Sequence, residues 1–470
     1  MPAIGTSDAP LRVAVVGSGP AAFYTAEHLF ASKDLTVEID MYERLPTPFG
    51  LVRFGVAPDH AKIKSVTRVY DRVASQEGFR FYGNVDVGRH LTLEDLRRHY
   101  HVVCYATGAQ TDRRMGVPGE DLPRSYTATE FVAWYNGHPD YRDRAFDLSV
   151  ERVAVVGVGN VAVDVARILC RTTEELARTD IADYALDALA ESRVREVHML
   201  GRRGPAQAAF TNAEIKELGE LEGADIVIDP AEAQLDPLSA AALEQSGDKG
   251  VTKKVEILQE FAARPRSDKP KTLTVRFLVS PVELLGDAST GVTGARLVHN
   301  ELYESDDGSL RPRPTDRHEE LPVEMVFRSV GYRGVPCDGL PFAEDRAVVP
   351  NEHGRVVDPE TGERVPGAYV SGWIKRGPSG VIGTNKPDAL ETVKAIVEDV
   401  RGGAVPTPES ADPAASERLV VERQPDYVSY EDWRVLDALE TARGEAAGRP
   451  RVKFCTVEEM LEAVRGGESR

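Results

Sequence analysis

Closely spaced cysteines are missing from this sequence. Its 470 residues include four cysteines, Cys104, Cys170, Cys337 and Cys455, and no CxxC motif. Cysteines this far apart do not match the ligand spacing of an iron–sulfur cluster, a structural zinc site or a redox dithiol. We therefore expect four buried or half-buried free thiols in a reducing compartment and no metal site.

Long apolar runs are also missing. The longest, such as Val13–Val16 and Val153–Val156, have the length of strands, whereas a membrane helix needs roughly 20 apolar residues. The N-terminal segment MPAIGTSDAPLR has neither a basic start nor an apolar core, so it does not resemble a secretion signal or a transit peptide. These observations predict no membrane insertion and a location in a bacterial-type cytoplasm.

The chain has no excess of positive charge. Lysine and arginine number 57 against 76 acidic residues, which gives a net charge of −19 at pH 7. Nucleic acid is therefore not expected as a partner, because phosphate binding needs a basic surface. An acidic partner protein would need a local basic patch. The length favours two to three domains.

A glycine-rich loop follows the first apolar strand. The letters GSGPAA come directly after Arg12–Val16 and fit the pattern G-x-G-x-x-G/A. In this pattern Gly17 permits a tight turn and Gly19 lets a pyrophosphate approach the backbone at a helix N-terminus. The second strand, residues 36–42, is followed by Glu43, where a carboxylate accepts hydrogen bonds from an adenosine ribose. The loop therefore predicts a dinucleotide site.

The same arrangement appears again 140 residues later, with GVGNVA starting at Gly157 after the strand 151–156. The next strand, 194–200, leads not to an acid but to Arg202 and Arg203. Two guanidinium groups favour the dianionic 2′-phosphate of NADP over the free hydroxyl of NAD. The second loop therefore predicts an NADP site.

The repeat predicts an α/β fold with two Rossmann-like dinucleotide-binding domains. The first loop is followed by a ribose-binding acid and the chain returns to the first domain at its C-terminal end, which is the usual arrangement of flavoproteins in which the NADP domain is inserted into the FAD domain. We expect residues 1–109 and 331–470 to form the discontinuous FAD-binding domain, with a C-terminal extension at 402–470, and residues 110–330 to form the NADP-binding domain. Strands expected at 272–279, 294–302 and 324–330 suggest an antiparallel insertion in the second domain. Residues 402–415 have the composition of a surface linker.

Seven stretches carry a family resemblance. They read VGSGPAAFYTAEHL, PFGLVRFGVAPDH, YATGAQTDR, GVGNVAVDVARIL, GRRGPAQAAFT, RSVGYRG and GWIKRGPSGVIGTNK. In this order they resemble adrenodoxin reductase and its bacterial relatives, the ferredoxin–NADP⁺ reductases of the adrenodoxin-reductase type, from about Val13 to Val400. The resemblance implies FAD and NADP(H) as cofactors, hydride transfer between them, and single-electron transfer to a ferredoxin, an acidic iron–sulfur protein. A cytochrome P450 is a candidate further acceptor. The 470 residues contain no ferredoxin-like stretch, so we expect an external acceptor.

The loops and the resemblance together assign site residues. For FAD these are Gly17, Gly19, Pro20, Ala21, Glu43, Leu51, Val87, Trp373, Gly380, Val381 and Ile382. For NADP(H) they are Arg113, Gly159, Asn160, Val161, Arg202, Arg203 and Glu214, with Gly380 shared. Position 22 is Ala where some relatives have Gly, and the motif tolerates either residue.

His60 and Glu214 are the only acid–base candidates. From spacing alone, His60 fits a packing role in its loop and Glu214 fits a solvated helix face, whereas the resemblance places both in the active site. Neither is required for hydride transfer itself. Lys375 and Arg376 fit either phosphate binding or partner docking.

Two other functions compete with this one. A glutamate-synthase-like electron-input subunit also holds two dinucleotides, but such subunits normally bring cysteine-rich cluster ligands, which this chain lacks. A non-catalytic FAD-bound redox sensor is the second alternative, and the complete NADP loop with its arginine pair argues against it.

Overall fold

The computed structural model describes residues 3–467 and divides them into two compact α/β units. The first unit comprises the described residues of Met1–Val56, His60–Thr111 and Gly331–Arg470, and the second comprises Ala57–Asp59 and Asp112–Val330. The sequence placed the boundaries at 109/110 and 330/331 and contained no sign that residues 57–59 pack with the second unit. Both units have a parallel sheet, which confirms the predicted fold class.

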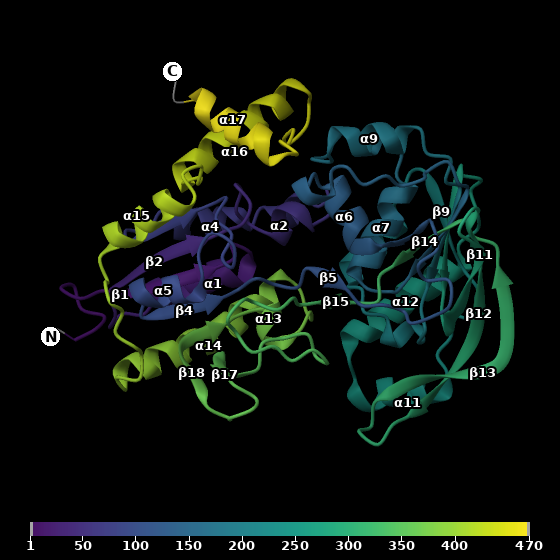
Figure 1. Cartoon of the computed structure of the whole chain (residues 1–470). Coiled ribbons are helices and arrows are strands. Elements are labelled where there is room, and N and C mark those ends of the chain that lie inside the picture. The colour runs from purple at the N-terminus through teal and green to yellow at the C-terminus, as the bar shows by residue number, and fades with distance from the viewer. Residues whose placement is uncertain (1–2, 468–470) are drawn as a thin grey trace. The chain divides into compact units, whose positions relative to one another are not determined.

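A seven-stranded sheet forms the centre of the first unit, in the order β16-β17-β18-β4-β1-β2-β3. Figure 1 labels β17, β18, β4, β1 and β2 of this sheet. Its strands are β1 (Leu11–Val16), β2 (Val37–Tyr42), β3 (Phe79–Tyr82), β4 (Val102–Tyr105), β16 (Asn351–Glu352), β17 (Arg355–Val357) and β18 (Arg364–Val370). The five strands from β18 to β3 are parallel, and β16 and β17 are antiparallel additions at one edge. Every residue of β1 is buried, as expected for a central parallel strand covered on both faces.

The described helices of the first unit lie before, between and after these strands in the sequence. They are α1 (Pro20–Phe30), α2 (Leu51–Phe54), α3 (Ala61–Lys64), α4 (Thr67–Ala74), α5 (Leu93–His99), α13 (Trp373–Arg376), α14 (Asn385–Arg401), α15 (Pro413–Arg423), α16 (Tyr430–Ala446) and α17 (Val457–Gly467). Helix α1 packs along α14, and α16 packs on β3 and α17. The expected linker 402–415 is shorter than predicted, because Asp412 caps α15 and starts it at Pro413.

The second unit contains a six-stranded parallel sheet in the order β6-β14-β7-β8-β10-β9. Its strands are β6 (Ser125–Thr127), β7 (Arg152–Val156), β8 (Glu196–Leu200), β9 (Ala224–Ile228), β10 (Lys271–Arg276) and β14 (Met325–Arg328). The helices are α6 (Ala128–Tyr135), α7 (Asn160–Cys170), α8 (Thr173–Leu176), α9 (Asp183–Ala190), α10 (Asn212–Leu218), α11 (Pro237–Ser246) and α12 (Lys249–Ala263). A separate antiparallel sheet consists of β11 (Val279–Asp287), β12 (Gly291–Glu304) and β13 (Leu310–Leu321).

The predicted antiparallel insertion was only partly right. Of the three expected strands, 294–302 lies in the antiparallel sheet, whereas 272–279 and 324–330 correspond mainly to β10 and β14 of the parallel sheet. The partner strand β13, LRPRPTDRHEEL, has no fully buried residue and contains two prolines. Proline is confined to edge strands and bulges, so its presence hid this strand in the sequence.

All four cysteines are free and buried, as predicted. Burial raises the pKa of the Cys104 thiol to about 12, so this group is not a thiolate at neutral pH. Among residues 3–467, no helix combines the length and the apolar character needed to cross a membrane.

Candidate cofactor sites

The first glycine loop joins β1 to α1. Gly17 has a φ of 102°, and a Cβ at this position would lie 2.6 Å from the carbonyl oxygen of Ala106, directly after the neighbouring strand β4, so only glycine fits. Gly19 is the N-cap of α1 and Pro20 its first residue. The space beside Gly19 is open, since a Cβ there would meet no atom within 4 Å. The unpaired N–H groups of the α1 N-terminus therefore face a space where an anion can bind.

Glu43 follows β2 and lies beside this loop. Its carboxylate accepts hydrogen bonds from Ser18 Oγ at 2.6 Å and from the Leu45 N–H at 3.1 Å. Burial raises the pKa of Glu43, and these two hydrogen bonds oppose the rise. The carboxylate is thus held next to the first glycine loop.

A turn-rich segment packs on the same loop. The Phe49 N–H donates to the Ser18 carbonyl at 3.0 Å, although Phe49 has a left-handed φ of 85° that non-glycine residues rarely adopt. A Cβ on Gly50 would lie 3.1 Å from Gly19 Cα, which shows how closely the two loops approach. Leu51 opens α2 directly after this approach, and its side chain is exposed.

The C-terminal extension anchors this segment through a buried ion pair. Arg53, on α2, donates to both carboxylate oxygens of Glu440 on α16, at 2.8 and 2.5 Å. Glu440 is fully buried and also accepts hydrogen bonds from Arg451 at 3.1 Å and from the Phe454 N–H at 2.9 Å. The Arg53 guanidinium lies 5.2 Å from the centre of the Trp433 ring. No motif in the sequence indicates this role for the extension.

The glycine-rich segment 372–384 precedes α14. Trp373 opens α13 and donates from Nε1 to the Ser379 carbonyl at 3.1 Å. Gly380 has a φ of 78°, Val381 is half exposed, and Ile382 begins the short turn of helix that leads into α14. The segment thus presents accessible backbone at the N-terminus of a 17-residue helix.

Lys375 fits neither of the two roles that the sequence left open for it. It is buried, and its Nζ lies 2.7 Å from Glu391 and 3.3 Å from Asp388. Asp388 also accepts the Gly372 N–H at 2.6 Å and lies 3.4 Å from Arg376. Lys375 and Asp388 therefore hold the backbone of the glycine-rich segment in place.

Two further predicted residues lie elsewhere in the first unit. Val87 is half buried and forms an isolated parallel bridge with Leu91. His60 is buried and precedes α3, where its carbonyl accepts the Ile63 N–H at 3.0 Å.

The second glycine loop joins β7 to α7. Gly157 has a φ of 139°, and a Cβ there would lie 2.2 Å from the Ser329 carbonyl oxygen. Gly159 is the N-cap of α7 and has open space beside it. Asn160 Oδ1 accepts the Thr211 N–H at 2.9 Å, and Val161 follows it in the first turn of α7. The loop repeats the geometry of the first one.

The arginine pair lies after β8. Arg202 is exposed and Arg203 half buried, and within the described part of the chain neither forms an ion pair with a carboxylate. Burial and the charge of Arg202 lower the pKa of Arg203. Arg113 is also exposed, so its guanidinium is accessible from solvent. Two adjacent cations without acidic partners favour an anionic ligand.

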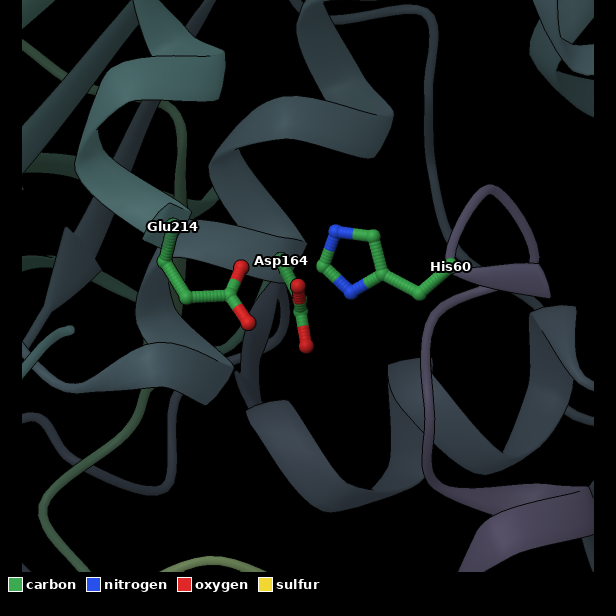
Figure 2. Close-up of side chains that lie close together, drawn as sticks. All are labelled: His60, Asp164 and Glu214. Atoms are coloured by element: carbon green, nitrogen blue, oxygen red, sulfur yellow. The ribbon is translucent and has the colours of Figure 1, made fainter. Parts of the chain in front are cut away.

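Glu214 lies in a buried charged cluster rather than on a solvated helix face. Its carboxylate and that of Asp164 approach within 4.8 Å (Figure 2). Arg167 on α7 lies 2.7 Å from Asp164, 3.2 Å from Glu214 and 2.7 Å from Asp59. Burial lowers the pKa of Arg167, but Asp164 and Asp59 outweigh this effect and raise it overall. His60, which Figure 2 also labels, belongs to the first unit.

Sequence reasoning missed Asp59, Asp164 and Arg167. All three lie in the stretches PFGLVRFGVAPDH and GVGNVAVDVARIL that carry the resemblance. The spacing of Asp164 and Arg167 by three residues on a helix was a readable sign of an ion pair. Their joint burial with Asp59 depends on a contact between distant segments, which the spacing does not reveal.

Comparison with known proteins identifies the family. Residues 11–216 match the model of the pyridine nucleotide-disulphide oxidoreductase family. A Mycobacterium tuberculosis protein named "Probable ferredoxin/ferredoxin--NADP reductase" is 48% identical, over 97% of this chain and 76% of its own length. The NADPH-ferredoxin reductase FprA of Mycobacterium leprae is 44% identical over 97% of this chain and 98% of its own. Human mitochondrial NADPH:adrenodoxin oxidoreductase is 41% identical over 97% of this chain and 92% of its own length.

The fold agrees with these matches. The structure described as M. tuberculosis FprA in complex with NADPH superimposes with a TM-score of 0.90 at 45% identity, covering 97% of this chain and all of that one. Both glycine loops, the strand-end acid and the arginine pair lie within the matched length. The chain belongs to the ferredoxin–NADP⁺ reductases of the adrenodoxin-reductase type.

Proposed function

We propose that this protein is a cytoplasmic FAD-containing reductase that carries electrons from NADPH to a ferredoxin. The proposal rests mainly on the two glycine loops and on the residues that follow the next strand in each unit, which are acidic in the first unit and basic in the second. Glu43 follows the second strand of the first unit and accepts a hydrogen bond from Ser18 in the first loop. Arg202 and Arg203 follow the corresponding strand of the second unit, and neither forms an ion pair with a carboxylate of residues 3–467. The relatives named as NADPH-ferredoxin and NADPH:adrenodoxin reductases support it.

FAD fits the first unit. The α1 N-terminus at Gly17–Ala21 would hold its pyrophosphate and Glu43 its ribose, because Gly19 leaves open space above the N–H groups. The remaining proposed contacts are Leu51, Val87, Trp373 and the segment Gly380–Ile382. The N-terminus of α14 behind this segment would stabilise negative charge on the reduced flavin ring.

NADP(H) fits the second unit. The α7 N-terminus at Gly159–Val161 would hold the pyrophosphate, and the accessible Arg202 and Arg203 the 2′-phosphate. Arg113 is the third proposed cation. Glu214 is proposed to contact the nicotinamide end, where Arg167 keeps its carboxylate in place at 3.2 Å.

Bound FAD would supply the chemistry, by accepting a hydride from NADPH and releasing electrons singly. The residues of the chain bind and orient the two cofactors, which is the main requirement for hydride transfer. His60 and Glu214 are the proposed acid–base groups, and both are buried. The four cysteines are buried and free, so we place the electron acceptor outside the chain, as a ferredoxin that could in turn serve a cytochrome P450.

Steady-state NADPH oxidation tests the proposal, first with ferricyanide and then with ferredoxin plus cytochrome c. We expect activity in both assays and a yellow protein with flavin absorbance. Activity with ferricyanide but not with ferredoxin would contradict the proposal that ferredoxin is the electron acceptor. If NADPH is not oxidised in either assay, the protein is not a reductase and the FAD-bound redox sensor is the alternative that fits. Screening the ferredoxins of the same cell would then identify the carrier.

A further inference from the structure

The arginine pair lies on a segment whose backbone is bonded to the turn between β10 and β11. The Gly201 N–H donates to the Arg276 carbonyl at 2.9 Å, and the Val279 N–H donates to the Gly201 carbonyl at 3.0 Å. The Leu278 N–H then donates to the Arg203 carbonyl at 3.1 Å. The hydrogen bonds of β8 to its neighbour thus continue beyond Leu200, and they fix the backbone of the arginine segment against this turn.

Asn300 on β12 connects both arginines to the antiparallel sheet. Its Nδ2 donates to the Arg202 carbonyl at 3.1 Å and to Ser280 Oγ at 2.8 Å. Its backbone N–H donates to the Leu278 carbonyl at 2.7 Å. Leu278 has a left-handed φ of 56°, which costs energy for a non-glycine residue and must be held by its neighbours. A single residue thus fixes the Arg202 carbonyl directly and the Arg203 carbonyl through Leu278.

An irregularity in the partner strand β13 lies next to Asn300. The register of β12 against β13 shifts between Val298 and Asn300, and the intervening His299 carbonyl accepts Thr315 Oγ1 at 2.7 Å. The extra residues lie on β13, and bulges recur beside functional sites. The Asn300 side chain is buried, where an amide is stable only if it is hydrogen-bonded. Its two donor bonds satisfy that requirement, and one of them ends at the Arg202 carbonyl.

We propose that Asn300 is a positioning residue for cofactor selectivity, holding Arg202 and Arg203 ready for the 2′-phosphate of NADPH. This inference rests on the proposed assignment of the two arginines to that phosphate. A segment that is already ordered loses little entropy when its ligand binds, so the fixed backbone increases affinity without touching the ligand. NADH has no 2′-phosphate, so its binding does not depend on the direction of the arginines. In this proposal, the antiparallel sheet β11–β13 supports the arginine segment that distinguishes NADPH from NADH.

The variant Asn300→Leu tests this, because leucine has a similar size and cannot donate to the Arg202 carbonyl. We expect kcat/KM for NADPH to fall about tenfold through KM, with kcat and the NADH parameters unchanged, since losing one or two hydrogen bonds corresponds to about that factor. Ser280→Ala is the milder variant, expected to shift selectivity in the same direction by a smaller factor. Glu301→Gln, on an exposed residue of the same strand, is the matched control and should leave selectivity unchanged.

The double variant Arg202→Ala/Arg203→Ala, measured in parallel, separates the two levels of the proposal. A loss of NADPH preference in the double variant, with Asn300→Leu and Ser280→Ala both retaining it, overturns the role of Asn300 and leaves the reductase assignment intact. An equal fall of kcat/KM for NADPH and NADH in Asn300→Leu also overturns it, because that pattern indicates a general structural defect. Retained preference in the double variant overturns the phosphate assignment itself, and the role of Asn300 with it.

Discussion

Replacing Glu440 by glutamine should loosen FAD binding, although Glu440 lies in the C-terminal extension. The substitution keeps the size of the side chain and removes its charge. Arg53 would then be buried without the carboxylate that both of its terminal nitrogens now contact. Arg53 lies on α2, directly after the Phe49–Gly50 turn that packs on the phosphate loop. Breaking the ion pair therefore releases that turn.

The magnitude follows from burial. Arg53 is 5% exposed and Glu440 is fully buried, and removing one partner of such a pair costs about 3–5 kcal/mol. Glutamine still accepts one hydrogen bond, which favours the lower end of that range. If half of this lost free energy had stabilised the Phe49–Gly50 turn, FAD affinity drops about tenfold, because about 1.4 kcal/mol corresponds to a factor of ten.

The pH dependence of stability supplies a second readout. Burial raises the pKa of Glu440, but the charge and hydrogen bonds of Arg53, the charge of Arg451 and the Phe454 N–H together outweigh burial and lower the pKa below the ordinary value of 4.5. A carboxyl with a lowered pKa in the folded state stabilises the protein above its ordinary pKa, and this stabilisation is lost as the pH falls toward the folded pKa. Glu440→Gln should therefore lower the melting temperature at pH 7. It should also reduce the difference between the melting temperatures measured at pH 7 and at pH 4.

The assay compares the melting temperatures of the holoprotein and the FAD-free protein, together with FAD retention during dilution. Glu445→Gln is the matched control, because Glu445 lies on the same helix with its side chain exposed. We expect a reduced gap between the two melting temperatures for Glu440→Gln and an unchanged gap for the control. Unaltered FAD retention and unaltered melting in Glu440→Gln would refute the reasoning.

The remaining predictions concern the phosphate loops and the buried histidine. Replacing Arg202 and Arg203 by alanine should raise KM for NADPH at least tenfold and leave KM for NADH nearly unchanged, because charge-assisted hydrogen bonds contribute roughly 1.5–3 kcal/mol each. An equal rise of KM for NADPH and for NADH would contradict the assignment of the two arginines to the 2′-phosphate. Gly17→Ala should yield FAD-free protein in an absorbance scan, because its Cβ would lie 2.6 Å from the Ala106 carbonyl oxygen, and normal flavin content would disprove this. His60→Ala should lower turnover modestly and keep FAD bound, and complete loss of activity with FAD retained would show that His60 is essential.

The sequence predicted well those features that depend on local pattern. The loops at Gly17 and Gly157 were identifiable because each lies between a strand and a helix at fixed spacing. Contacts between distant segments were not identifiable, and they include the ion pair of Arg53 with Glu440 and the hydrogen bond of Asn300 to Arg202. Each joins residues that no motif relates, so only the folded chain brings them together.

The same distinction explains the error in the antiparallel sheet. A short apolar strand has the same pattern whether its neighbours are parallel or antiparallel, so β10 and β14 were placed in the wrong sheet. Their pairing is decided by crossover connections over tens of residues. The buried environment of Glu214 was equally hidden, since its helix NAEIKEL has the charge pattern of a solvated face.

The three residues Ala57–Asp59 make the inserted unit inseparable from the sequence around it. Cutting the chain at 111 and 330 would isolate most of the second unit but would leave Asp59 behind. Arg167, fully buried, would then lose a carboxylate at 2.7 Å, and Arg171 would lose its contact with the same group at 2.7 Å. An excised fragment 112–330 would thus carry a partly uncompensated cation in its interior. The insertion is therefore not a module that can be transplanted whole, and exchanging it between relatives requires the short APD segment to travel with it.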